Sequence, residues 1–180
     1  MPRLFTALEV PAEIGERLSL LRGGLPGARW IDSDFYHVTL RFIGDIDFRT
    51  ADEVADALSR VKRRDIALHI DGLASFGSAK PHSVVARVAP SRGLGELQAE
   101  QERIVQKIGL PPEGRRFTPH VTLARLRGTA QRDVANYLAL RGGFFAGPIP
   151  VSRFVLYSSK DSTGGGPYLL EQSYPLAEAA

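Results

Sequence analysis

The tetrapeptide His-Val-Thr-Leu occurs twice in this 180-residue chain, first as His37-Val38-Thr39-Leu40 and again as His120-Val121-Thr122-Leu123. The surroundings of the two copies also agree, because each has an aromatic residue upstream, Phe35 or Phe117, and a glycine downstream. Two copies placed nearly half a chain apart predict two similar lobes, each of which contributes one strand to a shared groove.

The residue types within the tetrapeptide predict a strand with one polar and one apolar face. Successive side chains of a strand point to opposite faces, so Val38 and Leu40 enter the core. His37 and Thr39 then share the other face, with their Cα atoms about 6–7 Å apart. If the two strands meet, two imidazoles and two hydroxyls converge on one small volume.

Such a set of groups suits the cleavage of a phosphodiester. This reaction needs a base for the attacking oxygen, an acid for the leaving oxygen, and hydrogen-bond donors for the charge that builds on the phosphoryl oxygens. Imidazole titrates near neutral pH, so one histidine can be neutral while its twin is protonated. Each histidine would then contribute roughly 10²–10⁴ in rate.

Further short segments accompany the motifs. They are residues 3–8 (RLFTAL), 28–30 (ARW), 37–44 (HVTLRFIG), 117–125 (FTPHVTLAR) and 156–159 (LYSS). Together they resemble the two-histidine phosphoesterase superfamily, and more closely its RNA 2′,3′-cyclic phosphodiesterase branch, historically called 2′-5′ RNA ligase. The resemblance covers nearly the whole chain.

The resemblance implies a fold and a reaction. Family members are bilobal α+β proteins, whose two similar lobes of antiparallel sheet, with helices packed outside, flank a central cleft. They open 2′,3′-cyclic phosphates to 2′-phosphates without a metal or an organic cofactor. Matched to this sequence, His37 is the general acid, His120 the general base, Thr39 and Thr122 bind the phosphate, and Arg125 contacts the phosphate or the base. We therefore expect an RNA or oligonucleotide substrate with a 2′,3′-cyclic phosphate end, and a monomer whose single domain spans residues 1–180.

The residues alone leave other readings open. The two histidines could be partly buried strand residues with satisfied hydrogen bonds, and the two threonines could reflect β propensity. The same groove could serve a non-catalytic protein that binds RNA ends. The chemistry could also act on a different nucleotide substrate, or run in reverse as 2′-5′ RNA ligation.

Three polar residues outside the motif positions are expected to lie at the surface. Arg41 shares the strand phase of His37, which places it on the solvent side. His69 lies between two core-facing residues, and His82 follows Lys80-Pro81 in a turn. Neither has ligand spacing to the motif histidines, which argues against a zinc site.

A few features near the motifs permit two interpretations each. The Arg115-Arg116 pair is consistent with RNA steering and with a solvated loop. Phe5 and Phe42 are consistent with core packing and with platforms for base stacking. The run from Gly164 to Gly166 lacks the Lys-Ser or Lys-Thr of a phosphate-binding loop, so we expect a hairpin tip there.

Helical and strand patterns alternate along the chain, which predicts the α+β class. A helix follows Pro11, a second follows a capping box formed by Thr50 and Glu53, a third runs from Ser91 to Gly109, and a fourth has Thr129 as its N-cap. Strands are predicted at residues 4–10, 36–43, 66–73, 83–89, 121–126, 151–158 and 168–174.

Composition limits the remaining classes. The chain has 43% hydrophobic residues and 24% charged residues, which excludes collagen-like and disordered proteins. It has no cysteine, which excludes disulfide scaffolds and thiolate chemistry. The start lacks the apolar core of a signal peptide, and nowhere do 18 apolar residues run together, so we expect a cytoplasmic protein without a membrane segment. A net charge of +3 is a weak indication of an anionic partner.

Overall fold

Antiparallel pairing joins the strands into one sheet. In a computed structural model, which describes residues 2–159 and 166–178, the sheet has the order β7-β4-β5-β6-β3-β1-β8-β9, and β2 adds a further pairing with β6. The strands are β1 (Arg3–Glu9), β2 (Ala28–Trp30), β3 (His37–Asp45), β4 (Ile66–Phe76), β5 (Ser83–Val88), β6 (His120–Leu126), β7 (Phe145–Val151), β8 (Arg153–Ser159) and β9 (Tyr168–Pro175). The helices are α1 (Ala12–Ser19), α2 (Phe48–Leu58), α3 (Arg92–Ile108) and α4 (Gln131–Arg141), with a short 3-10 helix, η1 (Ser33–Phe35).

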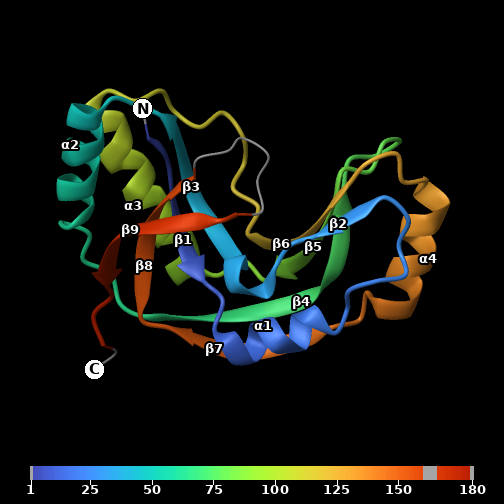
Figure 1. The fold of residues 1–180 in the computed structure, drawn as a ribbon. Helices are drawn as coiled ribbons and strands as arrows, with labels where there is room; N and C mark the ends of the chain where they lie inside the picture. The colour runs from blue at the N-terminus through green and yellow to red at the C-terminus, as the bar shows by residue number, and fades with distance from the viewer. Residues whose placement is uncertain (1, 160–165, 179–180) are drawn as a thin grey trace.

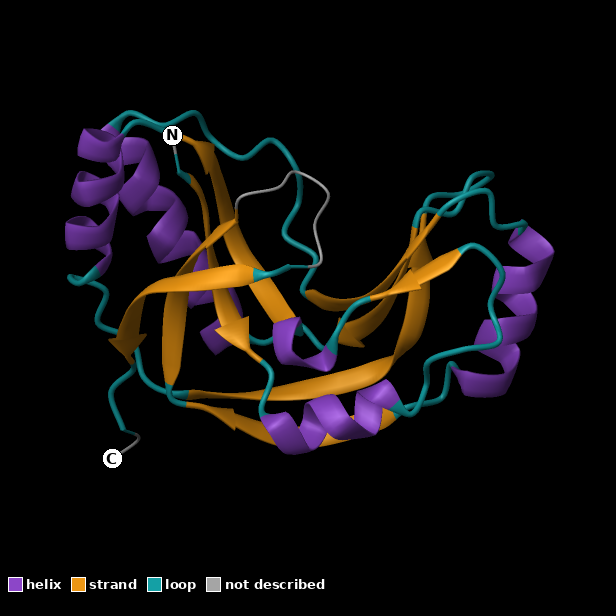
Figure 2. Ribbon diagram, viewed as in Figure 1, coloured by secondary structure: helices purple, strands orange, loops and turns teal. Residues whose placement is uncertain are grey.

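The seam between β3 and β6 divides the sheet into two lobes. The β3 lobe contains β3, β1, β8 and β9, and the β6 lobe contains β6, β5, β4, β7 and the short β2. Figure 1 shows α2 and α3 outside the β3 lobe, α4 outside the β6 lobe and α1 below the sheet. Figure 2 shows the strands curving between these helices. The predicted bilobal α+β architecture is therefore confirmed.

Neither lobe is built from one continuous half of the chain. The β4–β5 hairpin belongs to the first half of the chain but pairs with β6 and β7, which belong to the second half. The β8–β9 hairpin belongs to the second half but pairs with β1 of the first half. Each lobe consequently combines strands from the first half of the chain with strands from the second half. The core is continuous across the seam, because one cluster of buried apolar residues includes members of both lobes.

The longest helix forms as its sequence pattern predicts. The side chain of Ser91 caps α3 by accepting a hydrogen bond from the backbone N–H of Leu94 at 3.3 Å. Leu97 and Val105 are buried on the face that packs toward the sheet. The helix ends at Gly109, whose φ of 115° suits glycine and few other residues.

Two predicted helix caps are wrong. The predicted box of Thr50 and Glu53 is replaced by Asp47, whose carboxylate accepts a hydrogen bond from the backbone N–H of Thr50 at 2.7 Å. The helix therefore starts two residues before Thr50. Thr129 does not cap α4, because its buried hydroxyl donates to the backbone carbonyl of Pro26 at 2.7 Å. At α2 an earlier carboxylate caps the helix in place of the predicted residues. At α4 a carbonyl group distant in sequence binds the hydroxyl of the predicted cap.

The predictions omitted β2, η1 and β7. β2 and η1 have three residues each, too few to show a periodicity. β7 contains Pro148 and Pro150, which normally argue against a strand, but this strand lies at the edge of the sheet, where proline is tolerated. The antiparallel pairing of β8 with β9 is confirmed. Most of the predicted hairpin tip at Gly164–Gly166 lies outside the described residues. No helix in the described ranges is long and apolar enough to cross a membrane.

Candidate active site

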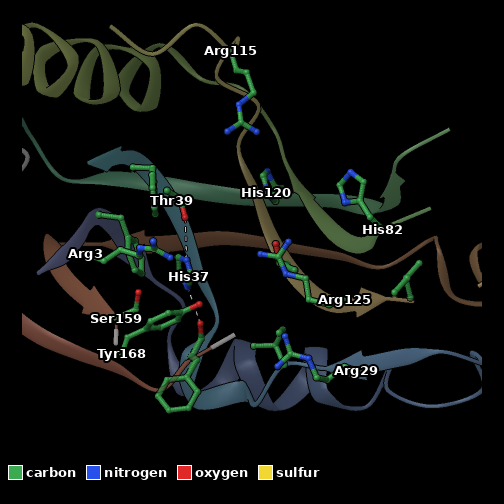
Figure 3. A pocket seen from close by; sticks show the side chains of 16 residues that line it. Arg3, Arg29, His37, Thr39, His82, Arg115, His120, Arg125, Ser159 and Tyr168 are labelled. Carbon is green, nitrogen blue, oxygen red and sulfur yellow. Dashed lines mark hydrogen bonds between the residues drawn. The ribbon is translucent and has the colours of Figure 1, made fainter. Parts of the chain in front are cut away.

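The seam brings the two tetrapeptides together. Val38 and Val121 are paired directly across β3 and β6, and both are fully buried. Antiparallel register on either side of this pair sets His37 toward Thr122 and Thr39 toward His120. All four polar residues line one open cavity of about 580 Å³ (Figure 3). The predicted convergence of the two motifs is what the fold produces.

Both imidazole rings are oriented by the same local hydrogen bond. The Nδ1–H of His37 donates to the carbonyl oxygen of Phe35 at 2.8 Å, and that of His120 donates to the carbonyl oxygen of Thr118 at 2.6 Å. A carbonyl oxygen can only accept, so these contacts fix the proton on Nδ1 in the neutral rings. Each Nε2 then presents its lone pair in the cavity. In the first motif this Nε2 accepts a hydrogen bond from the hydroxyl of Thr39 at 3.0 Å.

The environments of the two rings differ. The ring centroid of His37 lies 5.1 Å from that of Phe5 and 5.3 Å from that of Tyr168. This burial lowers the pKa of His37 to about 4, with smaller contributions from His120 and Arg125. The ring of His120 stands edge-on to Phe76 at 4.7 Å, and burial lowers its pKa as well. Both rings are therefore neutral at neutral pH when the cavity holds no anion.

The low pKa of His37 predicts a loss of stability on acidification. The unfolded chain binds this proton near pH 6.5 and the folded chain only near pH 4, so unfolding takes up a proton within that window. The stability that His37 contributes is therefore fully present above pH 6.5, and up to about 3 kcal/mol of it is lost as the pH falls to 4. We expect His37→Asn to flatten this part of a curve of unfolding free energy against pH.

The matched control for that curve is the exposed His69. Because His37 is intact in His69→Asn, this variant should retain the loss of stability that His37 causes between pH 6.5 and 4. If His37→Asn and His69→Asn give the same curve, the buried imidazole is not the group that titrates.

Both motif strands carry a β-bulge at the leucine of the tetrapeptide. In β3, Ala7 pairs with Thr39 and Thr6 pairs with Arg41, so Leu40 is the extra residue. In β6, the corresponding extra residue is Leu123. A bulge reverses the alternation of the residues that follow it. The predicted surface position of Arg41 is therefore wrong, because the side chain turns inward and its exposed fraction is 6%.

The buried Arg41 anchors a loop beside the cavity. Its guanidinium forms an ion pair with Glu102 of α3 and donates to the backbone carbonyl of Pro111 at 2.5 Å. Glu102 also accepts hydrogen bonds from Gln106 and from the backbone N–H of Glu113 at 2.9 Å. Burial raises the pKa of Glu102, but these three sets of donors together hold it below its usual value. The segment that carries Arg115 and Arg116 is thus tied to the motif strand.

Cationic side chains collect around the cavity. Arg125, a predicted site residue, lies on β6 directly opposite Arg29 of β2, and both line the cavity. Like charges opposite one another on adjacent strands repel, so this pairing favours a bound anion between or beside them. Arg3 and Arg115 line the same cavity, and Figure 3 shows these arginines on several sides of the two histidines.

Some cavity residues were not predicted as site residues. Arg3 and Arg29 belong to segments that carry the family resemblance, which was the available signal. Tyr168 reaches the cavity through the late return of β9, which no local pattern reveals. His69 and His82 are exposed, as expected, but His82 also lines the cavity. Among the described residues, no group of three or more His, Asp or Glu side chains is arranged to hold a metal ion.

Comparison with known proteins agrees with this geometry. The model of the LigT-like phosphoesterase family matches residues 8–86 and again residues 87–168. The chain belongs to the LigT-like phosphoesterase family. Each match contains one His-Val-Thr-Leu motif, so the family model recognises the internal repeat.

Relatives of this family are similar along most of the chain. A protein of Aeropyrum pernix named RNA 2′,3′-cyclic phosphodiesterase is 32% identical over 147 residues, which cover 79% of this chain and 82% of that protein. The Escherichia coli K12 protein of the same name is 26% identical over 165 residues, which cover 90% of this chain and 89% of that protein.

Solved structures share the fold of this chain. The crystal structure of TT0787 of Thermus thermophilus superposes with a TM-score of 0.82 at 21% identity, over 99% of this chain and all of that one. The structure of Escherichia coli LigT complexed with 3′-AMP gives a TM-score of 0.76 at 24% identity, over 98% of this chain and 99% of that one.

Proposed function

We propose that this protein is an RNA 2′,3′-cyclic phosphodiesterase that hydrolyses cyclic phosphate ends to 2′-phosphates. The observation that carries the proposal is the pair of imidazoles in one cavity, each with its Nδ1 proton held by a backbone carbonyl. That arrangement leaves two Nε2 atoms for one phosphorus centre. The names of the relatives from Aeropyrum pernix and Escherichia coli support the same reaction.

In the proposed reaction a water oxygen attacks phosphorus and the bond from phosphorus to the 3′-oxygen breaks. His120 removes a proton from the water through its free Nε2, and His37 gives a proton to the departing 3′-oxygen. Thr39 and Thr122 donate hydrogen bonds to the phosphoryl oxygens, and Arg125 offsets the negative charge that grows on them. The product carries its phosphate on the 2′-oxygen and a free 3′-hydroxyl.

The substrate itself prepares the acid. His37 is neutral in the free protein because burial disfavours its cation. A cyclic phosphate monoanion in the cavity supplies the opposite charge and raises the pKa of His37, since attraction between charges is strong where water is excluded. The histidine is thereby protonated when the phosphate is bound.

The experiment that tests the function uses purified protein and an oligonucleotide that ends in a 2′,3′-cyclic phosphate, with a chelator present. We expect complete conversion to the 2′-phosphate, identified by phosphorus NMR against 2′- and 3′-phosphate standards. A bell-shaped pH profile should accompany it, because one group acts as acid and another as base. A stable complex that forms without product would instead identify a protein that binds RNA ends, and its affinity would fall steeply with salt.

Assays with two further substrates test the alternative activities. Adding an oligonucleotide with a free 5′-hydroxyl tests for 2′-5′ joining, and a 2′,3′-cyclic mononucleotide tests whether a chain is needed. In the present proposal the oligonucleotide end is the substrate, and the enzyme acts in the cytoplasm as a monomer with one domain.

A further inference from the structure

The segment that connects α3 to β6, residues 110–119, contains no helix or strand, yet both of its ends are fixed. The ion pair of Arg41 with Glu102 anchors its first part. At its other end, the carbonyl oxygen of Pro119 accepts a hydrogen bond from the backbone N–H of Val88 at 3.1 Å. In Figure 1 this segment is yellow and runs from α3, outside the β3 lobe, to β6. The side chains in its middle are therefore presented from a backbone that is held at both ends.

Two of these side chains are arginines that face solvent. Arg115 and Arg116 are both exposed, and the side chain of Arg115 has an exposed fraction of 94%. The ion pair of Arg115 with Glu113 is long, with 3.7 Å between Nε and the carboxylate oxygen. Water screens so long and so exposed a pair, so it contributes little. Arg115 thus keeps most of its capacity to bind another anion.

The arginine at the other end of the catalytic cavity already has a carboxylate partner. Arg3 lines that cavity, but its guanidinium donates to both carboxylate oxygens of Asp45, at 3.3 and 2.8 Å. Such a two-point pair uses the geometry with which arginine also binds phosphate. Figure 3 shows Arg3 on the His37 side of the cavity, and Arg115 on the His120 side. The cation that is more available to an anionic ligand therefore lies on the His120 side.

A second cavity opens beside the catalytic one on that side. Its volume is about 380 Å³, within the range of roughly 300–1,000 Å³ that is usual for ligand pockets. Three exposed residues with hydrogen-bond donors line it, namely His82, Arg115 and Arg116. Among the described residues of its wall, Glu113 is the only acidic one. The two cavities share a border that consists of Thr39, Phe42, His82, Arg115 and His120.

An RNA end carries two anionic groups on its last nucleoside. The cyclic phosphate joins the 2′- and 3′-oxygens, and a phosphodiester connects the 5′-oxygen to the preceding nucleotide. When the cyclic phosphate lies between His37 and His120, the shared border allows one nucleoside to connect this position with the second cavity. Arginine binds phosphate oxygens through two parallel N–H groups, and an imidazole adds a further donor. The donors of the second cavity therefore suit the phosphodiester.

We propose that Arg115 and Arg116, together with His82, bind the phosphodiester on the 5′ side of the terminal nucleoside, so that the RNA strand leaves the cleft over residues 110–119. The inference rests on the proposed function, because it places the cyclic phosphate at the two motif histidines. It identifies the preferred substrate class as oligonucleotide ends. A free cyclic mononucleotide lacks the second anion and is therefore a weaker ligand.

The test compares binding of adenosine 2′-monophosphate with binding of adenosine 2′,5′-bisphosphate, which differs only by a phosphate on the 5′-oxygen. Neither compound contains a cyclic phosphate, so dissociation constants can be measured by calorimetry without turnover. We expect the wild type to bind the bisphosphate more tightly. The double variant Arg115→Ala/Arg116→Ala should weaken bisphosphate binding by roughly tenfold, since one exposed charge contact contributes up to about fivefold. Its affinity for the monophosphate should change much less.

Two further measurements report on the same contacts. Glu113→Gln removes the carboxylate from the second cavity and should tighten binding of the bisphosphate but not of the monophosphate. For an RNA oligonucleotide that ends in a 2′-phosphate, the logarithm of the association constant falls linearly with the logarithm of the salt concentration. In Arg115→Ala/Arg116→Ala this slope should be less steep by about 0.7 for each lost contact.

The charge-matched control is the double variant Arg49→Ala/Arg92→Ala. It removes two arginines whose side chains are 91% and 92% exposed and which lie outside both cavities. This variant should bind both compounds as the wild type does. Equal affinities of the wild type for the two compounds, or equal weakening of both by the loss of Arg115 and Arg116, would overturn the subsite.

Binding and hydrolysis are measured separately, so the two proposals can fail independently. A protein that hydrolyses cyclic phosphate ends but binds the two adenosine compounds equally would refute the subsite and support the activity. A protein that binds the bisphosphate through Arg115 and Arg116 but hydrolyses no cyclic phosphate would refute the activity and support the subsite.

Discussion

Alanine at either motif histidine is expected to lower kcat for cyclic phosphate hydrolysis by roughly 10²–10⁴. In the proposed reaction each imidazole supplies one of the two proton transfers, so its removal leaves that transfer without a catalyst. The double variant should be little slower than the worse single variant, because groups that act as a unit are not additive. Single-turnover rates of His37→Ala and His120→Ala on a dinucleotide with a cyclic phosphate end provide the measurement.

The two histidines can be told apart by the leaving group. If the 3′-oxygen is replaced by sulfur, the leaving thiolate needs little assistance from an acid. His37→Ala should then recover much of its lost rate, whereas His120→Ala should remain slow because the water still needs a base. The opposite pattern would exchange the two roles. His69→Ala, at an exposed histidine outside the cavity, should match the wild type on both substrates.

The second large effect is expected at Glu102 and concerns stability. Glu102→Leu removes the carboxylate that neutralises Arg41, whose side chain is 7% exposed, and it leaves a buried cation without its partner. Removal of one partner of such a pair costs about 3–5 kcal/mol of unfolding free energy. For a chain of this size, each kcal/mol corresponds to about 2–4 °C in Tm. Denaturant titration and thermal unfolding provide the measurements.

A nearby residue of α3 serves as the control. Glu96 pairs with Arg63 and Arg92, but its side chain is 43% exposed, so water screens these pairs and Glu96→Leu should cost far less unfolding free energy than Glu102→Leu. Replacing both Arg41 and Glu102 by leucine should cost less than the sum of the single changes, because no unpaired charge then remains. A Glu102→Leu variant as stable as Glu96→Leu would show that the pair contributes little.

The sequence predicts the convergence of His37 and His120 because a repeated motif specifies a repeated strand. The polar face of the tetrapeptide follows from strand alternation, which holds from residue 37 to residue 40. The burial of Arg41 could not be predicted, because the bulge that inverts the alternation depends on pairing with Thr6 and Ala7 of a different strand.

Long-range packing accounts for most of the other differences between the sequence-based predictions and the structure. Thr129 has the residue type of an N-cap, but the carbonyl of Pro26, distant in sequence, binds its hydroxyl. Tyr168 reaches the ring of His37 only because β9 pairs with β8, which in turn pairs with β1. Such contacts leave no local periodicity. The contact with Tyr168 contributes to the burial of His37, which lowers the pKa of that ring.

Each half of the chain contributes a hairpin to the lobe that contains the motif strand of the other half, and this arrangement affects folding during synthesis. The strand of the first histidine can pair with β1 early, but β1 obtains its other neighbour, β8, only when residues 153–159 have emerged from the ribosome. Until then an edge of β1 is unpaired, and such edges favour aggregation. Contacts between distant residues also slow folding. Fragments that stop before β8 should therefore depend on chaperones to a degree that the finished enzyme does not.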